Sequence, residues 1–243
     1  MIDAGVLEDP KPEYLVALHV YPEMMVGKVG VRSGLYMASS DEIHLQFIGV
    51  GGHGALPANC VNPLSMAAEV ILNAQKIIDE FHPEGVPTVL SFGRIEGLGS
   101  TNVIPSECTL KGTLRTMDEA WRAEFFERFT HFVNEVANRY GGSVEFNRAP
   151  GYPFLKNDPH VTKSVEQSLK LQLGEAHVET LPLRMTAEDF AFYSHKVPVC
   201  FFRLGVGDPE KAMNYGVHHP KFDIHADALR VGVEAMLSVV FNG

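Results

Sequence analysis

The sequence has no hydrophobic run that approaches the ~20 residues needed to cross a bilayer. It also has no cluster of lysine and arginine, and its formal net charge over 243 residues is −10. A globally acidic chain without a basic patch is a poor binder of nucleic acids and of anionic lipids. We therefore expect neither a nucleic acid nor a membrane among its partners.

Cysteine is scarce as well. The three cysteines, Cys60, Cys108 and Cys200, are far apart and form neither a C-x-x-C nor a Cys-x-His pair. This usage is typical of free, buried thiols in a reducing compartment. The first ten residues have neither the basic nor the apolar region of a secretory signal. We therefore expect a cytoplasmic protein.

The composition is that of a globular protein, with 45% hydrophobic and 21% charged residues. The apolar run at 14–20 predicts a strand buried on both faces, which Pro22 closes, so that His19 lies at a strand end. After residue 150 the pattern predicts helices that start at 157–159 and at 186–189, an apolar strand at 199–204 and a closing helix at 226–241. Residues 1–38 and 151–243 therefore predict one interrupted α/β domain.

Residues 39–150 show a different pattern. Alternation predicts a strand at 42–50, and helical periodicity follows over 63–81. Two strands near 88–96 and 107–115 come next, then a helix opened by the capping-box pattern Thr116-Met-Asp-Glu119 and a last strand at 143–149. This β-α-β-β-α-β order is the ferredoxin-like motif. We predict a compact inserted α+β domain.

Three histidines are candidates for chemistry. His19, at the predicted strand end, could donate a ring nitrogen to zinc, or it could be a structural histidine. His53 lies in Gly-Gly-His-Gly-Ala, where glycines let the backbone approach a ligand, although glycine turns with an exposed histidine are common. In His218-His219-Pro220 adjacent side chains point differently, so we expect at most one metal ligand there.

Two further residues are candidates for binding substrate. Asn102, in Thr-Asn-Val-Ile-Pro, has an amide that suits a carbonyl or an oxyanion, and the alternative is an Asx turn before the proline. Arg115 ends a predicted strand, where its guanidinium could bind a carboxylate bidentately, and the alternative is a solvated edge arginine.

The order of the motifs along the chain is more specific than any single motif. Taken together, LHVYP, GGHGALP, NPL, TNVIP, GTLRT, ND, MTAEDF and HHPKF resemble the metallo-aminoacylase family of hippurate hydrolases, N-acyl-amino-acid amidohydrolases and indole-acetyl-amino-acid hydrolases. The resemblance runs over essentially the whole chain. It implies a zinc-peptidase-like α/β catalytic domain over 1–38 and 151–243, incomplete here. It also implies that the inserted ferredoxin-like βαββαβ domain over 39–150 is a lid and dimerisation domain.

The resemblance also implies roles for single residues. His19 and His218 would be metal ligands, with two divalent ions (zinc, manganese or cobalt) per complete site. His53 and Asn102 would reach the scissile group, often in the neighbouring subunit of a homodimer formed through the lid. Arg115 would bind the substrate carboxylate. The implied reaction is the hydrolysis of an N-acyl-amino acid to a carboxylate and an amino acid.

The chain departs from the family pattern at one place. The family takes its remaining metal ligands from a Cys-Gly-His motif and a glutamate, and its general base from an adjacent glutamate, whereas this sequence contains neither Cys-x-His nor Glu-Glu. We therefore expect the C-terminal part of such an enzyme, without the upstream metal-binding segment and nearly inactive alone. Two alternatives stay open, a non-catalytic dimerisation module and an amino-acid-binding remnant that uses Arg115.

Overall fold

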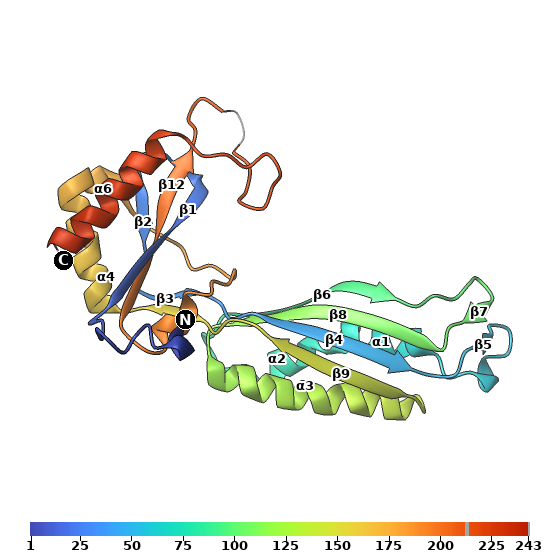
Figure 1. Cartoon of the computed structure of the whole chain (residues 1–243). Helices are drawn as coiled ribbons and strands as arrows, with labels where there is room; N and C mark the ends of the chain where they lie inside the picture. Colours follow the sequence, from blue (N-terminus) through green and yellow to red (C-terminus); the bar gives the residue numbers. More distant parts are fainter. Residues whose placement is uncertain (212–213, 243) are drawn as a thin grey trace. The chain divides into compact units, whose positions relative to one another are not determined.

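The computed structural model describes residues 1–211 and 214–242 and has a mixed α/β fold (Figure 1). The chain divides into two compact units. Unit 1 consists of Met1–Met37, Leu155–Arg184 and the chain from Asp189 onward, and unit 2 consists of Ala38–Phe154 with Met185–Glu188. No helix within these described residues is long and apolar enough to cross a membrane.

The centre of unit 1 is a four-stranded sheet in the order β1-β12-β2-β11. Its strands are β1 (Leu15–Met25), β12 (Val199–Gly207), β2 (Val29–Val31) and β11 (Val178–Thr180). β1 and β12 run parallel, and β1 is an edge strand. A separate antiparallel pair joins β3 (Gly34–Met37) to β10 (Leu155–Asn157).

Two helices cover one face of this sheet. They are α4 (Pro159–Leu173) and α6 (Asp227–Asn242), whose apolar residues form one core with Phe202 and Leu204 of β12 (Figure 1). The opposite face carries a second, smaller core around Phe201 and Tyr36. Because strand side chains alternate between faces, neighbouring residues of β12 serve different cores. Unit 1 also contains the short elements η1 (Ile2–Ala4), η3 (Glu175–His177) and α5 (Ala191–Ser194).

Unit 2 is an antiparallel sheet in the order β6-β8-β4-β9, with its helices on one face. The strands are β4 (Asp41–Ile48), β6 (Thr88–Glu96), β8 (Glu107–Thr116) and β9 (Ser143–Pro150), and the helices are α1 (Pro63–Asn73), α2 (Gln75–Phe81) and α3 (Glu119–Arg139). A small two-stranded sheet of β5 (Gly52–His53) and β7 (Val103–Ile104), with η2 (Pro57–Asn59) beside it in sequence, lies beyond the β4 and β8 ends (Figure 1). The predicted β-α-β-β-α-β order of elements is present.

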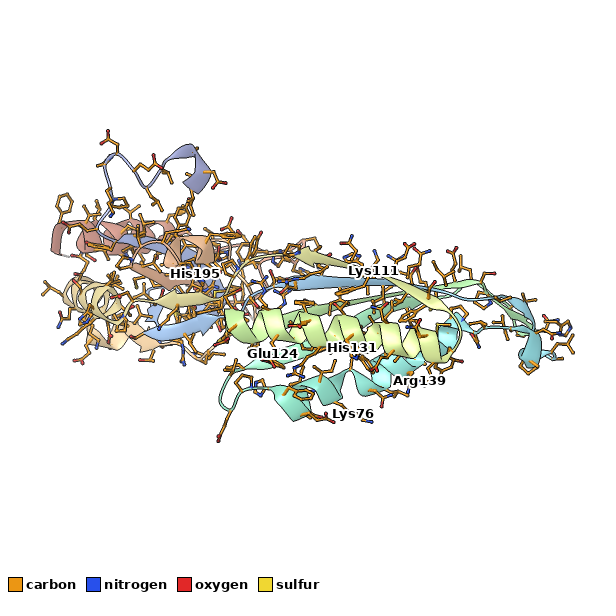
Figure 2. All side chains as sticks on the ribbon, turned by 90° about the horizontal axis from the view of Figure 1, so that it is seen from below. Lys76, Lys111, Glu124, His131, Arg139 and His195 are labelled. Atoms are coloured by element: carbon orange, nitrogen blue, oxygen red, sulfur yellow. The ribbon has the colours of Figure 1, made fainter. Side chains whose placement is uncertain are left out.

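The core of unit 2 follows from two periodicities. Ile43, Leu45 and Phe47 alternate along β4 and are fully buried. One face of α3 meets them with Phe125 and Phe129, whose rings stack with their centroids 5.5 Å apart. The outer face of α3 is polar and carries Glu124, His131 and Arg139 (Figure 2).

The prediction that Pro22 ends the first strand is wrong. β1 continues to Met25, and its pairing with β12 shifts register only between Tyr21 and Met25. An edge strand tolerates a proline, because the missing N–H costs no ladder hydrogen bond on the open side. His19 therefore lies inside a strand rather than at its end.

Three predicted helix boundaries also need correction. The helix over 63–81 is interrupted at Ala74, which keeps helical angles of φ −60° and ψ −29°. Asp118, not Thr116, caps α3, because its carboxylate accepts a hydrogen bond from the Trp121 amide at 2.7 Å. Thr116 is still part of β8 and pairs with Thr88 of β6. The helix expected from residue 186 is only the single turn α5.

Candidate functional site

His19 presents a defined ring nitrogen to its surroundings. Its Nδ1 lies 2.8 Å from the carbonyl oxygen of Val20. A carbonyl only accepts hydrogen bonds, so Nδ1 carries the proton, and in the neutral ring Nε2 keeps its lone pair. Metal-binding histidines are commonly fixed in this way, by a hydrogen bond from the other ring nitrogen to a backbone carbonyl.

Sequence reasoning missed a second polar residue beside His19. The Cα of Arg203 on β12 is the register partner of His19, so both side chains leave the same face of the sheet. Arg203 is only 6% exposed, and its Nε donates to the hydroxyl of Tyr36 at 3.1 Å. The sequence could have indicated this residue, because Arg203 is the one charged residue in the otherwise apolar strand β12.

His218 is exposed in the turn region that follows β12. The neighbouring His219 is fixed: its ring stacks on Tyr215 with centroids 4.2 Å apart, and its Nδ1 accepts from the Lys221 amide at 3.0 Å. His19 and His218 both belong to unit 1, and β12 leads into the segment that carries His218. Their sharing of one metal site stays a prediction.

The metal that the resemblance implies is not matched by a complete donor set. Within residues 1–211 and 214–242, no group of three or more His, Cys, Asp or Glu side chains could hold a metal ion. Catalytic zinc normally takes three protein ligands and a water. Two histidines alone do not meet this requirement, so the described part of the chain does not hold a complete metal centre.

His53 and Asn102 lie together at the β5–β7 end of unit 2. His53 is the register partner of Val103, and the Gly54 amide donates to the Asn102 carbonyl at 2.8 Å. The Ala55 amide donates to Nδ1 of His53 at 3.1 Å. An amide only donates, so the proton of a neutral His53 is on Nε2. His53 thus offers an N–H donor, where His19 offers a lone pair.

The glycines around His53 are required by close backbone approach. A Cβ on Gly51 would lie 2.7 Å from the Ile104 carbonyl oxygen, and one on Gly54 would lie 3.3 Å from that of Asn102. The Asn102 side chain accepts from the Ser100 hydroxyl at 3.0 Å through Oδ1. This leaves its NH₂ group as a second donor at this end of the unit.

Arg115 lies at the other end of β8. It is half-buried opposite Val89, and within the described residues it makes no side-chain hydrogen bond or ion pair. Glu107, at the β7 end of the same strand, is eight residues away, or about 26 Å at ~3.3 Å per residue. The structure therefore brings His53 and Asn102 together and holds Arg115 well apart from them.

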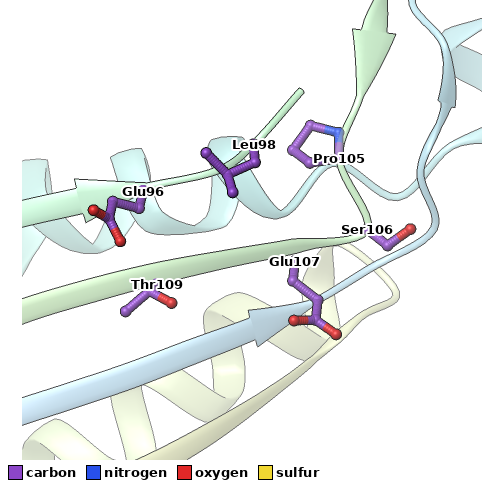
Figure 3. A pocket seen from close by; sticks show the side chains of 6 residues that line it. All are labelled: Glu96, Leu98, Pro105, Ser106, Glu107 and Thr109. Carbon is purple, nitrogen blue, oxygen red and sulfur yellow. The ribbon is translucent and has the colours of Figure 1, made fainter. Parts of the chain in front are cut away.

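A hollow of about 340 Å³ lies beside the β5–β7 end of unit 2 (Figure 3). Its lining is acidic, with Glu96 from β6 and Glu107 from β8. A hydrogen bond from Arg94 holds the pKa of Glu96 below its ordinary value. A pocket lined by two acidic side chains does not attract a substrate carboxylate.

Comparison with known proteins shows relatives along the whole chain. A model of peptidase family M20/M25/M40 matches residues 1–242. The N-acetylcysteine deacetylase of Bacillus subtilis is 30% identical over 99% of this chain and 61% of its own length. The N-acetyldiaminopimelate deacetylase of Enterococcus faecalis is 31% identical over 93% of this chain and 58% of its own length. The chain thus spans about three-fifths of the length of these relatives.

Solved structures agree with this result. A structure from methicillin-resistant Staphylococcus aureus matches with a TM-score of 0.82 and 28% identity, over 98% of this chain and 61% of that one. The YxeP protein of Bacillus subtilis, a dinuclear metal-binding peptidase of the M20 family, matches with a TM-score of 0.73 and 25% identity, over 99% of this chain and 60% of its own. This chain belongs to peptidase family M20/M25/M40.

Proposed function

We propose that this chain is part of a metal-dependent amidohydrolase that cleaves N-acyl-amino acids to a carboxylate and an amino acid. The named relatives are deacetylases of N-acetylcysteine and N-acetyldiaminopimelate, which supports this substrate class. One observation carries the proposal: the two histidines have opposite polarity. His19 keeps a lone pair on Nε2, as a metal ligand must, and His53 keeps a proton there, as a donor to an oxyanion must.

In this proposal His53 and Asn102 act on the acyl carbonyl. When water attacks, negative charge develops on the carbonyl oxygen, and Nε2–H of His53 and the NH₂ of Asn102 donate to it. One such donor typically contributes about 3–4 kcal/mol to transition-state stabilisation. The implied zinc, manganese or cobalt ions need ligands beyond His19 and His218, so no step through a metal is assigned to this chain.

We propose that residues 1–243 do not turn over substrate alone. The described residues hold no three-ligand group, and the sequence lacks the glutamate pair that supplies the base in the family. Loss of a catalytic base alone typically costs several orders of magnitude in rate.

We further propose that unit 2 is a ferredoxin-like lid through which the protein forms a homodimer. Its sheet order, second-third-first-fourth strand, is that of the motif, and β6 and β9 are edge strands. Arg115 and the β7 end of unit 2 are about 26 Å apart along β8. A small acyl-amino acid cannot span this distance, so a site that uses both Arg115 and His53 must take them from two subunits.

A fusion tests the activity. The part of the Bacillus subtilis N-acetylcysteine deacetylase that this chain does not match is joined to residues 1–243, and N-acetylcysteine hydrolysis is measured with zinc, manganese or cobalt. We expect background rates from the chain alone and turnover from the fusion. His53→Ala should lower kcat of the fusion by about 10²–10³-fold. His131→Ala, an exposed histidine on α3, is the matched control and should leave it unchanged.

Two outcomes contradict the proposal. One is turnover by residues 1–243 alone that His53→Ala abolishes. The other is a fusion whose turnover does not respond to His53→Ala. If residues 1–243 and the fusion both form stable dimers and both are inactive, the result would instead support a non-catalytic dimerisation module.

Subunit complementation tests the shared site. The fusion is produced with His53→Ala in one subunit and Arg115→Ala in the other. If the two residues serve one site from different subunits, each mixed dimer keeps one intact site and regains activity that neither parent has. Mixed dimers as inactive as both parents would place His53 and Arg115 in the same subunit's site and contradict this arrangement.

A further inference from the structure

Unit 1 contains a second cluster of polar side chains that the proposed function does not use. We call Tyr21, Tyr36, Arg184 and Arg203 the arginine cluster. Arg203 projects from β12 on the face opposite α4 and α6, and its Nε donates to the Tyr36 hydroxyl at 3.1 Å. Its Nη2 lies 3.3 Å from the sulfur of Met37, and its guanidinium carbon lies 4.9 Å from the ring centre of Phe201. All these partners are uncharged.

Arg184 also contacts Tyr36, through its backbone. Its amide donates to the Tyr36 carbonyl at 2.9 Å, and its guanidinium stacks over the Tyr21 ring at 4.6 Å. Its Nε is buried and has no hydrogen-bond partner. Burial raises the pKa of Tyr36, and Arg203 and Arg184 both act against that rise, so both guanidiniums are within electrostatic reach of one hydroxyl.

Among the described residues, neither of these two guanidiniums has a carboxylate partner. Within residues 1–211 and 214–242, no aspartate or glutamate forms an ion pair with Arg184 or Arg203. Burying a cation without an anion is unfavourable, and a buried N–H without an acceptor adds to the cost. The planar fork of a guanidinium matches the two oxygens of a carboxylate. The missing partner therefore has a definite chemistry.

We propose that the arginine cluster is a binding site for a carboxylate, which accepts hydrogen bonds from the guanidiniums of Arg184 and Arg203. The carboxylate has two possible sources, a free organic acid such as an N-acyl-amino acid or an Asp or Glu side chain of another polypeptide segment. This site is separate from Arg115, which belongs to unit 2. The inference therefore does not depend on the substrate-binding role proposed for Arg115.

Binding to the full chain tests the site. Calorimetric titrations of residues 1–243 use acetate, N-acetylglycine and phosphate at one ionic strength set with sodium chloride. We expect acetate and N-acetylglycine to bind. Arg203→Lys, which keeps the charge but loses the fork, should weaken binding at least tenfold. Arg184→Gln should do the same without altering the buried Arg203.

Two controls keep the result specific. Arg230→Gln changes an exposed arginine of α6 that pairs with Glu234, and it should leave carboxylate binding unchanged. Arg115→Ala removes the arginine proposed for unit 2, and the part of the binding that depends on Arg184 and Arg203 should persist in it. Binding that Arg115→Ala abolishes and Arg184→Gln and Arg203→Lys do not would overturn this inference while leaving the proposed function intact. Tighter binding of phosphate than of either carboxylate, or no arginine-dependent binding at all, would overturn it as well.

The fusion with the unmatched part of the relative distinguishes the two sources. If a protein carboxylate occupies the cluster, N-acetylglycine should bind residues 1–243 through Arg184 and Arg203 but lose that binding in the fusion. If the ligand is a free acid, arginine-dependent binding should persist in both. Either result supports a carboxylate site and identifies its occupant.

Discussion

Each unit contains a buried arginine, and the partners of the two arginines differ. In unit 2, Arg122 is buried and binds the carboxylate of Asp41 with two hydrogen bonds of 2.6 and 3.0 Å. Arg148 and Glu119 extend this into a network of alternating charge. In unit 1, Arg203 is equally buried, and its side-chain partners among the described residues are a hydroxyl, a thioether and an aromatic ring. Unit 2 pairs its buried arginine with a carboxylate of its own, whereas no ion pair of Arg203 is found among the described residues of unit 1.

The exposed faces of the helices also differ between the two units. The outer face of α3 in unit 2 is polar (Figure 2). The outer face of α6 in unit 1 instead carries a row of large apolar residues that are 49–68% exposed, namely Leu229, Val233, Leu237 and Val240. A contiguous exposed apolar row is typical of a surface that packs against another segment. Among its described residues, unit 1 therefore combines a buried arginine that has no ion pair with an exposed apolar row on one helix.

Breaking the network of unit 2 should have the largest effect. Asp41→Ala removes the buried carboxylate beside the Arg122 guanidinium and leaves the partly exposed Glu119 as its anion, and we expect the free energy of unfolding of unit 2 to fall by about 3–5 kcal/mol. Urea unfolding followed by fluorescence measures it, because Trp121, the one tryptophan of the sequence, is buried in unit 2. A loss below about 1 kcal/mol would show that the network contributes no more than a surface pair.

The labelling rates of the buried cysteines compare how readily each unit unfolds locally. Burial raises the pKa of Cys200 in unit 1 to about 12 and also raises that of Cys108 in unit 2, whereas Cys60 is half-buried. With an ordinary thiol pKa near 9, Cys200 should react with a disulfide reagent at pH 8 at least about 10³-fold more slowly than a free thiol. Rapid labelling of Cys200 in the folded chain would contradict its burial.

The raised pKa of Cys200 also sets a pH dependence. The folded state favours the neutral thiol, so its contribution to stability is complete below pH 9 and is lost as the pH rises from 9 towards about 12. Unit 1 should therefore lose stability over this range. The labelling rates of Cys200 and Cys108 against pH would show which unit opens first.

Replacing Arg203 of unit 1 should change the free energy of unfolding in the opposite direction from replacing Arg122 of unit 2. Arg203→Met keeps the length of the side chain and removes a buried charge, so we expect unit 1 to gain roughly 1 kcal/mol or more. Arg122→Met should destabilise unit 2, because the buried Asp41 then keeps only the partly exposed Arg148 as its cation. Thermal unfolding followed by circular dichroism checks both. A clear loss of stability in Arg203→Met would mean that the chain already satisfies this charge.

The smallest effect belongs to an exposed pair. Arg128 and Glu124 are four residues apart on α3 and form a salt bridge of 2.7 Å. Arg128→Ala should cost less than about 1 kcal/mol, and the difference should shrink at high salt. A cost that is as large as that of Asp41→Ala would remove the distinction between the buried network and the surface.

The parts of the fold that sequence predicts well are those with strong periodicity. The alternation along β4 and the aromatic face of α3 fixed both elements, because each buries one side against a core. Boundaries were harder where two signals compete. Asp118 and Thr116 both suit an N-cap, and the pairing of β8 decides between them. Pro22 suggested a strand end, but the position of β1 at the sheet edge removes that penalty.

The candidate site divides in the same way. Glycine spacing located the His53 region, because close backbone approach there leaves no room for a Cβ. The pairing of Tyr36, Arg184 and Arg203 could not be predicted, since it joins residues 167 positions apart through tertiary packing. The ring nitrogen that each histidine presents also depends on a local hydrogen bond that sequence does not reveal. The roles of His19, His218, His53, Asn102 and Arg115 remain proposals.

Metal stoichiometry tests the central claim, that this chain supplies two ligands of a larger site, most directly. Residues 1–243 and the fusion are dialysed at a free zinc concentration that saturates the fusion, and bound zinc is counted by mass spectrometry. We predict less than one zinc per chain for residues 1–243. The fusion should bind zinc in a way that His19→Ala and His218→Ala each reduce. Stoichiometric zinc on residues 1–243 alone, lost in both variants, would contradict the account.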